Sequence, residues 1–222
     1  MLSIDAPVSE LVLESSSLAA VFDRYRIDYC CTGERSVRAV CEQRGIDPVK
    51  VMTDLELALR RREVQDIDAR AISTHELITK VIGRHHRYLH RTLPWLEGLA
   101  AKVARIHGER QPSLRDLARQ VVTLAQTLRA HLDDEERLLF PALLADEHEL
   151  ARPMLAAMVA EHETVDAMIA QLRATANDFT PPDWACASYR TLMTELEHLE
   201  ADTSRHLHLE NHELRPRFTG AS

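Results

Sequence analysis

The sequence is poor in aromatic residues, in glycine and in cysteine. Phe, Trp and Tyr make up 5% of the 222 residues, and only six glycines are present. The core must therefore be built mainly from leucine, alanine, valine, methionine and isoleucine, of which the straight-chain members favour helices. Four cysteines, two of them adjacent, do not make a disulfide framework in a chain of this length, so we expect reduced thiols. These shortages predict an all-α protein.

The sequence also lacks a surplus of positive charge and any long apolar run. Its 27 basic and 35 acidic residues give a formal net charge of -8, which repels phosphate backbones and anionic lipids. We therefore expect no nucleic acid and no membrane among its partners. The N-terminus shows no basic stretch followed by an apolar one, so neither a secretory signal nor a membrane anchor is expected, and a cytoplasmic location is predicted. A Gly-rich phosphate loop, a Cys-x-x-Cys pair and a His-Glu-x-x-His zinc motif are absent as well.

What is present is a mixture of 45% hydrophobic and 28% charged residues, typical of compact globular domains. Residues 1–65 carry short helical signals and are predicted to form a small helical domain. Residues 66–73 lose clear periodicity and are predicted to be a linker. Residues 74–222 carry signals for four long helices, over about 73–107, 113–139, 153–176 and 183–215. Four helices with short connections predict an up-down-up-down bundle.

Each predicted bundle helix has an apolar stripe with spacings of three and four residues, and a histidine interrupts each stripe. These histidines are His86, His131, His162 and His206, and in the second and fourth helices a glutamate follows four residues later, at Glu135 and Glu210. The stripe of the second helix continues to Leu138. Most of the other histidines lie off the stripes and are expected to be solvated, namely His85, His90, His148, His198, His208 and His212. The acidic residues Asp133, Asp134 and Glu136 are expected to form a solvated face.

One histidine in a core is ordinarily a packed imidazole with a hydrogen-bond partner, but four together with two carboxylates are costly to bury without a cation. Residues four apart share a helix face, so each His-x-x-x-Glu pair can reach a common centre. Four imidazoles and two carboxylates are too many ligands for one catalytic zinc, whereas a carboxylate can bridge two ions. Two metal ions are therefore predicted. Imidazole and carboxylate suit iron, and ligand type leaves manganese open.

The segments around His86, His131-Leu-Asp-Asp-Glu135, Glu161-His162-Glu163 and His206-Leu-His-Leu-Glu210 resemble a hemerythrin-like domain. The N-terminal Asp28-Tyr29-Cys30-Cys31-Thr32-Gly33 resembles the short domain that precedes it in the di-iron iron-sulfur cluster repair proteins (repair of iron centres). The resemblance spans almost the whole chain and implies a hemerythrin-like four-helix bundle behind a small helical domain.

Carried over residue by residue, the resemblance implies that the four stripe histidines are terminal ligands of two iron ions per chain, joined by an oxo or hydroxo bridge. It also implies that Glu135 and Glu210 bridge these ions. Oxygen-carrying hemerythrins have a further histidine four residues after the ligand of the third helix, where this chain has Asp166. That departure implies a centre that binds nitric oxide or loses iron more readily. A homodimer formed through the N-terminal domain is expected on the same analogy.

Three functions follow as hypotheses. The first is a stress-response protein that repairs iron-sulfur clusters damaged by nitric oxide or peroxide, by donating iron to them; Cys30 and Cys31 would accept iron or nitrosyl, although two small residues in a tight turn explain them as well. The second is a di-iron enzyme that binds or reduces nitric oxide. The third is an oxygen-binding or sensing hemerythrin.

Overall fold

A computed structural model describes residues 2–15, 18–29, 33–60 and 72–219, and within these the regular elements are helices. An isolated bridge joins Pro7 to Ser36. The all-α class predicted from the sequence is confirmed. Among the described residues, no helix combines the length and the apolar character needed to cross a membrane.

Four short helices form the N-terminal part: α1 (Val8–Glu14), α2 (Ala19–Tyr25), α3 (Val37–Arg44) and α4 (Pro48–Arg60). Local signals set their ends. The Ser36 side chain accepts a hydrogen bond from the Ala39 amide and starts α3, and Gly45 ends it with a left-handed φ of 65°. Asp47 Oδ1 accepts from the Val49 amide at 2.9 Å, as expected before a helix that begins with proline. The helices enclose a core that includes Leu11, Phe22 and Tyr29.

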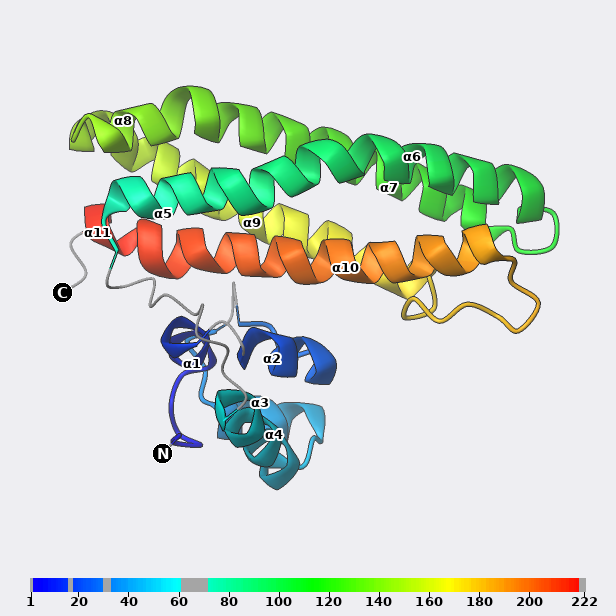
Figure 1. The fold of residues 1–222 in the computed structure, drawn as a ribbon, viewed down its shortest axis with the longest axis horizontal. Helices are drawn as coiled ribbons and strands as arrows, with labels where there is room; N and C mark the ends of the chain where they lie inside the picture. The colour runs from blue at the N-terminus through cyan, green and yellow to red at the C-terminus, as the bar shows by residue number, and fades with distance from the viewer. Residues whose placement is uncertain (1, 16–17, 30–32, 61–71, 220–222) are drawn as a thin grey trace. The chain divides into compact units, whose positions relative to one another are not determined.

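The remaining helices are long and follow one another with short connections (Figure 1). The first is α5 (Thr74–Val81), η3 (Ile82–His86) and α6 (Arg87–His107), and the second is α7 (Ser113–Asp134), η4 (Glu135–Leu139) and α8 (Phe140–Leu144). Then come α9 (His148–Thr175) and a last helix of α10 (Ala187–Leu209), η5 (Glu210–Leu214) and α11 (Pro216–Thr219). A capping box begins the first of these helices, because the Ser73 amide donates to Glu76 and the Glu76 amide donates to Ser73. The third helix begins at His148 rather than near Pro153, so this proline lies inside it.

Contacts between distant residues show how these helices pack. Helix α7 contacts both α6 and α9. Lys102, late in α6, donates to Ser188, early in α10, whereas His85, in η3, lies 3.1 Å from Asp202, late in α10. The first and last helices therefore run antiparallel, as an up-and-down bundle requires. Arg173 donates to Glu200 and joins α9 to α10.

By internal contacts the chain divides into two compact units, residues 1–78 with 204–222 and residues 79–203. Within the first unit, η5 contacts α1, and the Arg205 guanidinium donates to Asp23 at 3.1 Å. The predicted domains, 1–65 and 74–222, and the linker between them stay a prediction, because residues 61–71 lie outside the described residues.

Candidate metal centre

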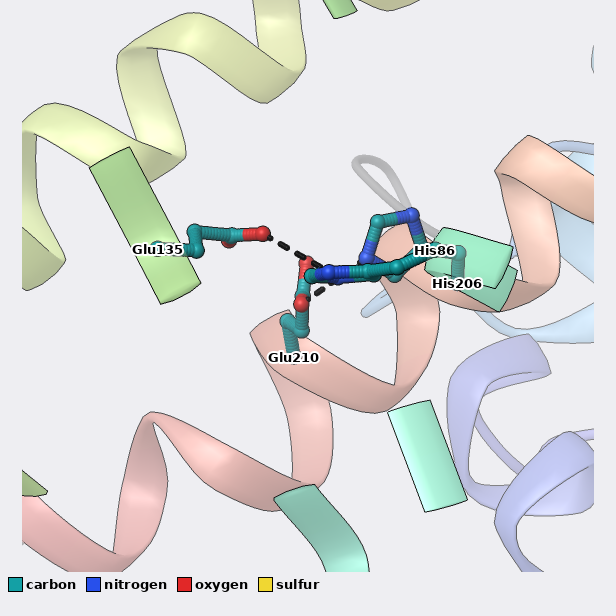
Figure 2. A group of neighbouring side chains, drawn as sticks. All are labelled: His86, Glu135, His206 and Glu210. Atoms are coloured by element: carbon teal, nitrogen blue, oxygen red, sulfur yellow. Dashed lines mark hydrogen bonds and ion pairs between the residues drawn. The ribbon is translucent and has the colours of Figure 1, made fainter. Parts of the chain in front are cut away.

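The six residues predicted as metal ligands are all buried, each with 3% or less of its surface exposed. They fall into two groups whose ligand atoms lie within 4.8 Å of one another. One group is His86, Glu135, His206 and Glu210, and the other is His131, Glu135, His162 and Glu210. Figure 2 shows the first group, with its side chains directed toward one another. The two glutamates belong to both groups, whereas each histidine belongs to one.

The ring nitrogens of the histidines face carboxylates or one another. His86 Nε2 lies 3.4 Å from Glu135 Oε2, and His131 Nε2 lies 3.3 Å from Glu135 Oε1. In the other pair, His206 Nε2 is 2.9 Å from Glu210 Oε1. Each oxygen of Glu135 thus faces a different histidine, which is the arrangement a bridging carboxylate needs.

A second contact brings the Nε2 atoms of His131 and His162 to 3.3 Å from each other. Glu161 Oε2 accepts a hydrogen bond from His131 Nδ1 at 2.9 Å, so the proton of a neutral His131 ring sits on Nδ1 and its Nε2 carries a lone pair. Two nitrogens bound to one ion at about 2.1 Å and at right angles lie about 3 Å apart. The spacing of these two nitrogens therefore fits a shared cation.

The helices that carry these residues widen locally where the residues lie. Within the described residues, π-helical segments end at His86, begin at Glu135 and begin at Glu210. Such single-turn widenings insert one residue into an α-helix and occur often at functional sites. One inserted residue rotates everything beyond it by about 100°. The sequence pattern, which assumes an unbroken α-helix, does not reveal them.

This rotation overturns two expectations from the sequence. Leu138 was predicted to lie on the inward stripe of the second helix, but it is 53% exposed and Leu139 is buried instead, because η4 shifts the register. His85 was expected to be solvated, yet it is buried, because η3 directs it toward Asp202. His208, also expected to be solvated, is buried against Tyr29.

A further carboxylate that the sequence placed on a solvated face is part of the site. Glu136 Oε1 accepts a hydrogen bond from His86 Nδ1 at 2.8 Å and lies 3.4 Å from His90 Nε2. Partial burial would raise the pKa of Glu136, but the hydrogen bond and charge of His86 outweigh it and lower the pKa below its usual value. Histidines that bind metals usually donate their other N–H to a carboxylate or carbonyl. Glu136 does this for His86, as Glu161 does for His131.

Replacing Glu136 by Gln is therefore expected to weaken metal binding about 10- to 100-fold without removing a ligand. The amide accepts the His86 proton less strongly, so the ring is held less firmly in the tautomer that presents Nε2. Competition with a chelator of known affinity measures this change. Asp134→Asn is the matched control, because Asp134 is exposed, and equal weakening in both variants would contradict the role of Glu136.

The other residues that the sequence singled out have different outcomes. Cys30 and Cys31 lie outside the described residues, so their thiol role stays a prediction. Asp166 is half-buried and belongs to neither group of metal-binding residues. His208 donates from Nδ1 to the Tyr29 carbonyl at 2.8 Å, and burial together with the charge of His212 lowers its pKa to about 3.

The donor set fits metal ions better than it fits a metal-free core. A neutral imidazole has one N–H, yet His86 has a carboxylate at each nitrogen, Glu136 at Nδ1 and Glu135 at Nε2. His131 has the same arrangement with Glu161 and Glu135. In both histidines a single N–H would have to serve two carboxylates. A cation bound at Nε2 removes this conflict, because Nδ1–H can then donate to Glu136 in His86 and to Glu161 in His131. Buried imidazole and carboxylate without thiolate match the ligands of iron, zinc or manganese.

Comparison with known proteins agrees with this chemistry. Residues 77–218 match the family model described as the hemerythrin HHE cation binding domain, and residues 4–59 match ScdA_N, described as a domain of unknown function. Similar proteins include those named iron-sulfur cluster repair protein YtfE from Enterobacter sp. (strain 638), 30% identical, and from Citrobacter koseri, 29% identical. Each alignment runs over 213 residues and covers 96% of this chain and 96% of the relative. The chain therefore belongs to the hemerythrin HHE family and, over nearly its whole length, to the family of the YtfE iron-sulfur cluster repair proteins.

Proposed function

We propose that this protein holds two iron ions at the six-residue centre and donates iron to damaged iron-sulfur clusters of other proteins. The observation that carries the proposal is that Glu135 and Glu210 belong to both groups of metal-binding residues. A carboxylate has two oxygens and can bridge ions about 3.5 to 4 Å apart. The names of the relatives support the choice of iron and of cluster repair as the task.

In this proposal each residue has a distinct part. His86 and His206 serve one ion, His131 and His162 the other, and the two glutamates serve both. Glu136 and Glu161 keep His86 and His131 in the tautomer that presents Nε2 to the centre. When bound, iron supplies coordination positions that a solvent oxo or hydroxo group, nitric oxide or an incoming thiolate can take.

The small number of protein ligands available to each ion supports release of iron rather than permanent retention. Two histidines and two shared carboxylates give each ion fewer protein ligands than octahedral iron accepts, and the position of a further histidine is held by Asp166. Exchangeable positions let an acceptor bind before the ion leaves. We therefore infer that iron is cargo here, with damaged iron-sulfur proteins as partners, under nitrosative or oxidative stress in the cytoplasm. A homodimer belongs to the same proposal.

The proposal is tested by iron transfer from the loaded protein to an aconitase-type acceptor whose cluster has been depleted. Recovery of acceptor activity is expected, with a matching fall in iron bound to the donor. The variant with Cys30→Ala and Cys31→Ala is expected to transfer iron only at the rate of spontaneous loss to a chelator, because a thiolate is a good ligand for iron in transit. Cys186→Ala is the control, since Cys186 is an exposed thiol of the bundle.

One result would contradict the role of the two thiols, and another would contradict iron donation itself. If the double cysteine variant transfers iron as fast as the unchanged protein, the thiol role is wrong. If the loaded protein instead turns over nitric oxide with a reductant, releases nitrous oxide and loses no iron, the protein is an enzyme of nitric oxide reduction and iron donation is wrong.

A further inference from the structure

A second cluster of histidines lies on the last helix, apart from the six-residue centre. His208 is two residues beyond His206 and two before Glu210, and two residues turn an α-helix by about 200°. His208 therefore faces away from the side of the helix that carries the two predicted ligands. It is 1% exposed and packs edge-on against the Tyr29 ring, with the ring centroids 5.4 Å apart.

Nδ1 of His208 is hydrogen-bonded to the backbone, and this determines which ring nitrogen carries the proton. The Tyr29 carbonyl only accepts hydrogen bonds, so Nδ1 carries the proton of the neutral ring and donates at 2.8 Å. Nε2 is left with its lone pair, and it is buried with no hydrogen-bond partner among the described residues. A ring that donates Nδ1–H to a backbone carbonyl and presents a bare Nε2 is oriented as metal-binding histidines usually are.

A second imidazole ring, that of His212, lies beside the His208 ring. His212 follows His208 by four residues, within the π-helical segment η5, and the two ring centroids lie 4.9 Å apart with their planes at 36°. His212 is half-buried, so it lies at the edge of the solvent, and water can complete the coordination of an ion there.

We propose that His208 and His212 bind one divalent transition-metal cation at a site of their own, separate from the six-residue centre. Imidazole nitrogens without carboxylate or thiolate select Zn²⁺, Ni²⁺ or Cu²⁺ over Mg²⁺ and Ca²⁺. The site depends only on these two side chains and on the hydrogen bond to Tyr29. The proposal of this second site is therefore independent of whether the protein donates iron.

The test is a calorimetric titration of the iron-loaded protein with Zn²⁺, while the absorbance of the iron centre is followed. We expect one zinc ion per chain to bind with no loss of iron. His212→Asn is expected to weaken this binding at least about tenfold, because it removes one of two protein ligands and leaves the buried His208 in place. His198→Asn is the control, because His198 lies on the same helix with 62% of its side chain exposed.

X-ray absorption at the zinc edge gives a second readout, in which scattering from two imidazole rings is expected in the unchanged protein. His208→Asn is expected to alter the packing at Tyr29, so the conclusion rests on His212→Asn, because the His212 ring is only half-buried. Zinc binding that is unchanged in His212→Asn would overturn the proposal. The absence of zinc binding, or zinc bound only as iron is released, would overturn it as well.

Discussion

Replacing Glu210 by Gln is expected to reduce bound iron from about two ions per chain to almost none, because the carboxylate serves both ions. Glu210 is fully buried and belongs to both groups of ligand atoms. The amide has one neutral oxygen in place of two that share a negative charge, so it neither bridges two cations nor balances their charge. Metal analysis of protein loaded with excess ferrous iron and then desalted measures the change.

Two further variants make this result specific. His162 belongs to one group only, so His162→Ala is expected to keep about one ion per chain, as a terminal ligand should. Glu197→Gln makes the same chemical change at an exposed position of α10 and should keep both ions. A Glu210→Gln protein that retains two ions would show that Glu210 is no bridge and would remove the observation on which the di-iron proposal rests.

Removing iron is expected to lower the melting temperature of the protein by about 10 to 20 °C. An ion present at 100 times its dissociation constant stabilises the folded state by about 2.7 kcal/mol, and two ions double this. A chain of this size shifts its melting temperature by about 2 to 4 °C for each kcal/mol. Without iron, Glu135 and Glu210 are two carboxylates buried in one small core, which is a costly arrangement.

The same reasoning predicts that the variant with Glu135→Gln and Glu210→Gln differs from the unchanged protein in melting temperature, and that the sign of this difference depends on whether iron is present. In the presence of iron this variant should melt below the unchanged protein, because it does not bind the ions. In the presence of a chelator it should melt above the unchanged protein, because two buried charges have become neutral amides. Calorimetry with and without chelator measures both differences, and Glu197→Gln should show neither. A melting temperature of the unchanged protein that chelation does not alter would contradict the prediction.

The helices and the six clustered side chains could be predicted from the sequence because both follow from local patterns. Apolar spacing of three and four residues defines a helix face, and a histidine followed by glutamate four residues later lies on that same face. The caps at Ser73 and at Asp47-Pro48 are equally local. Helix α1 has weaker local signals, because it is only seven residues long and its Pro7 N-cap makes no side-chain hydrogen bond.

The roles of Glu136 and Glu161, the carboxylates that accept from Nδ1 of His86 and His131, could not be predicted, because their partners are distant in the sequence. Glu136 bonds to a histidine 50 residues away, and Glu161 to one 30 residues away. On their own helices both residues have the pattern of a solvated face, and Glu161 stays 43% exposed. Only the packing of one helix beside another shows that these faces border the centre.

The sequence by itself determined the helical class, the apolar stripes and the six donor residues, because each depends on residues a few positions apart on one helix. The tertiary structure decided which donors share an ion, which carboxylates orient the rings, and where π-helical segments rotate Leu138 outward and His85 inward. It also decided that His208 is buried against Tyr29, 179 residues away. These features arise where separate helices meet, and no local periodicity records which surfaces will be brought together.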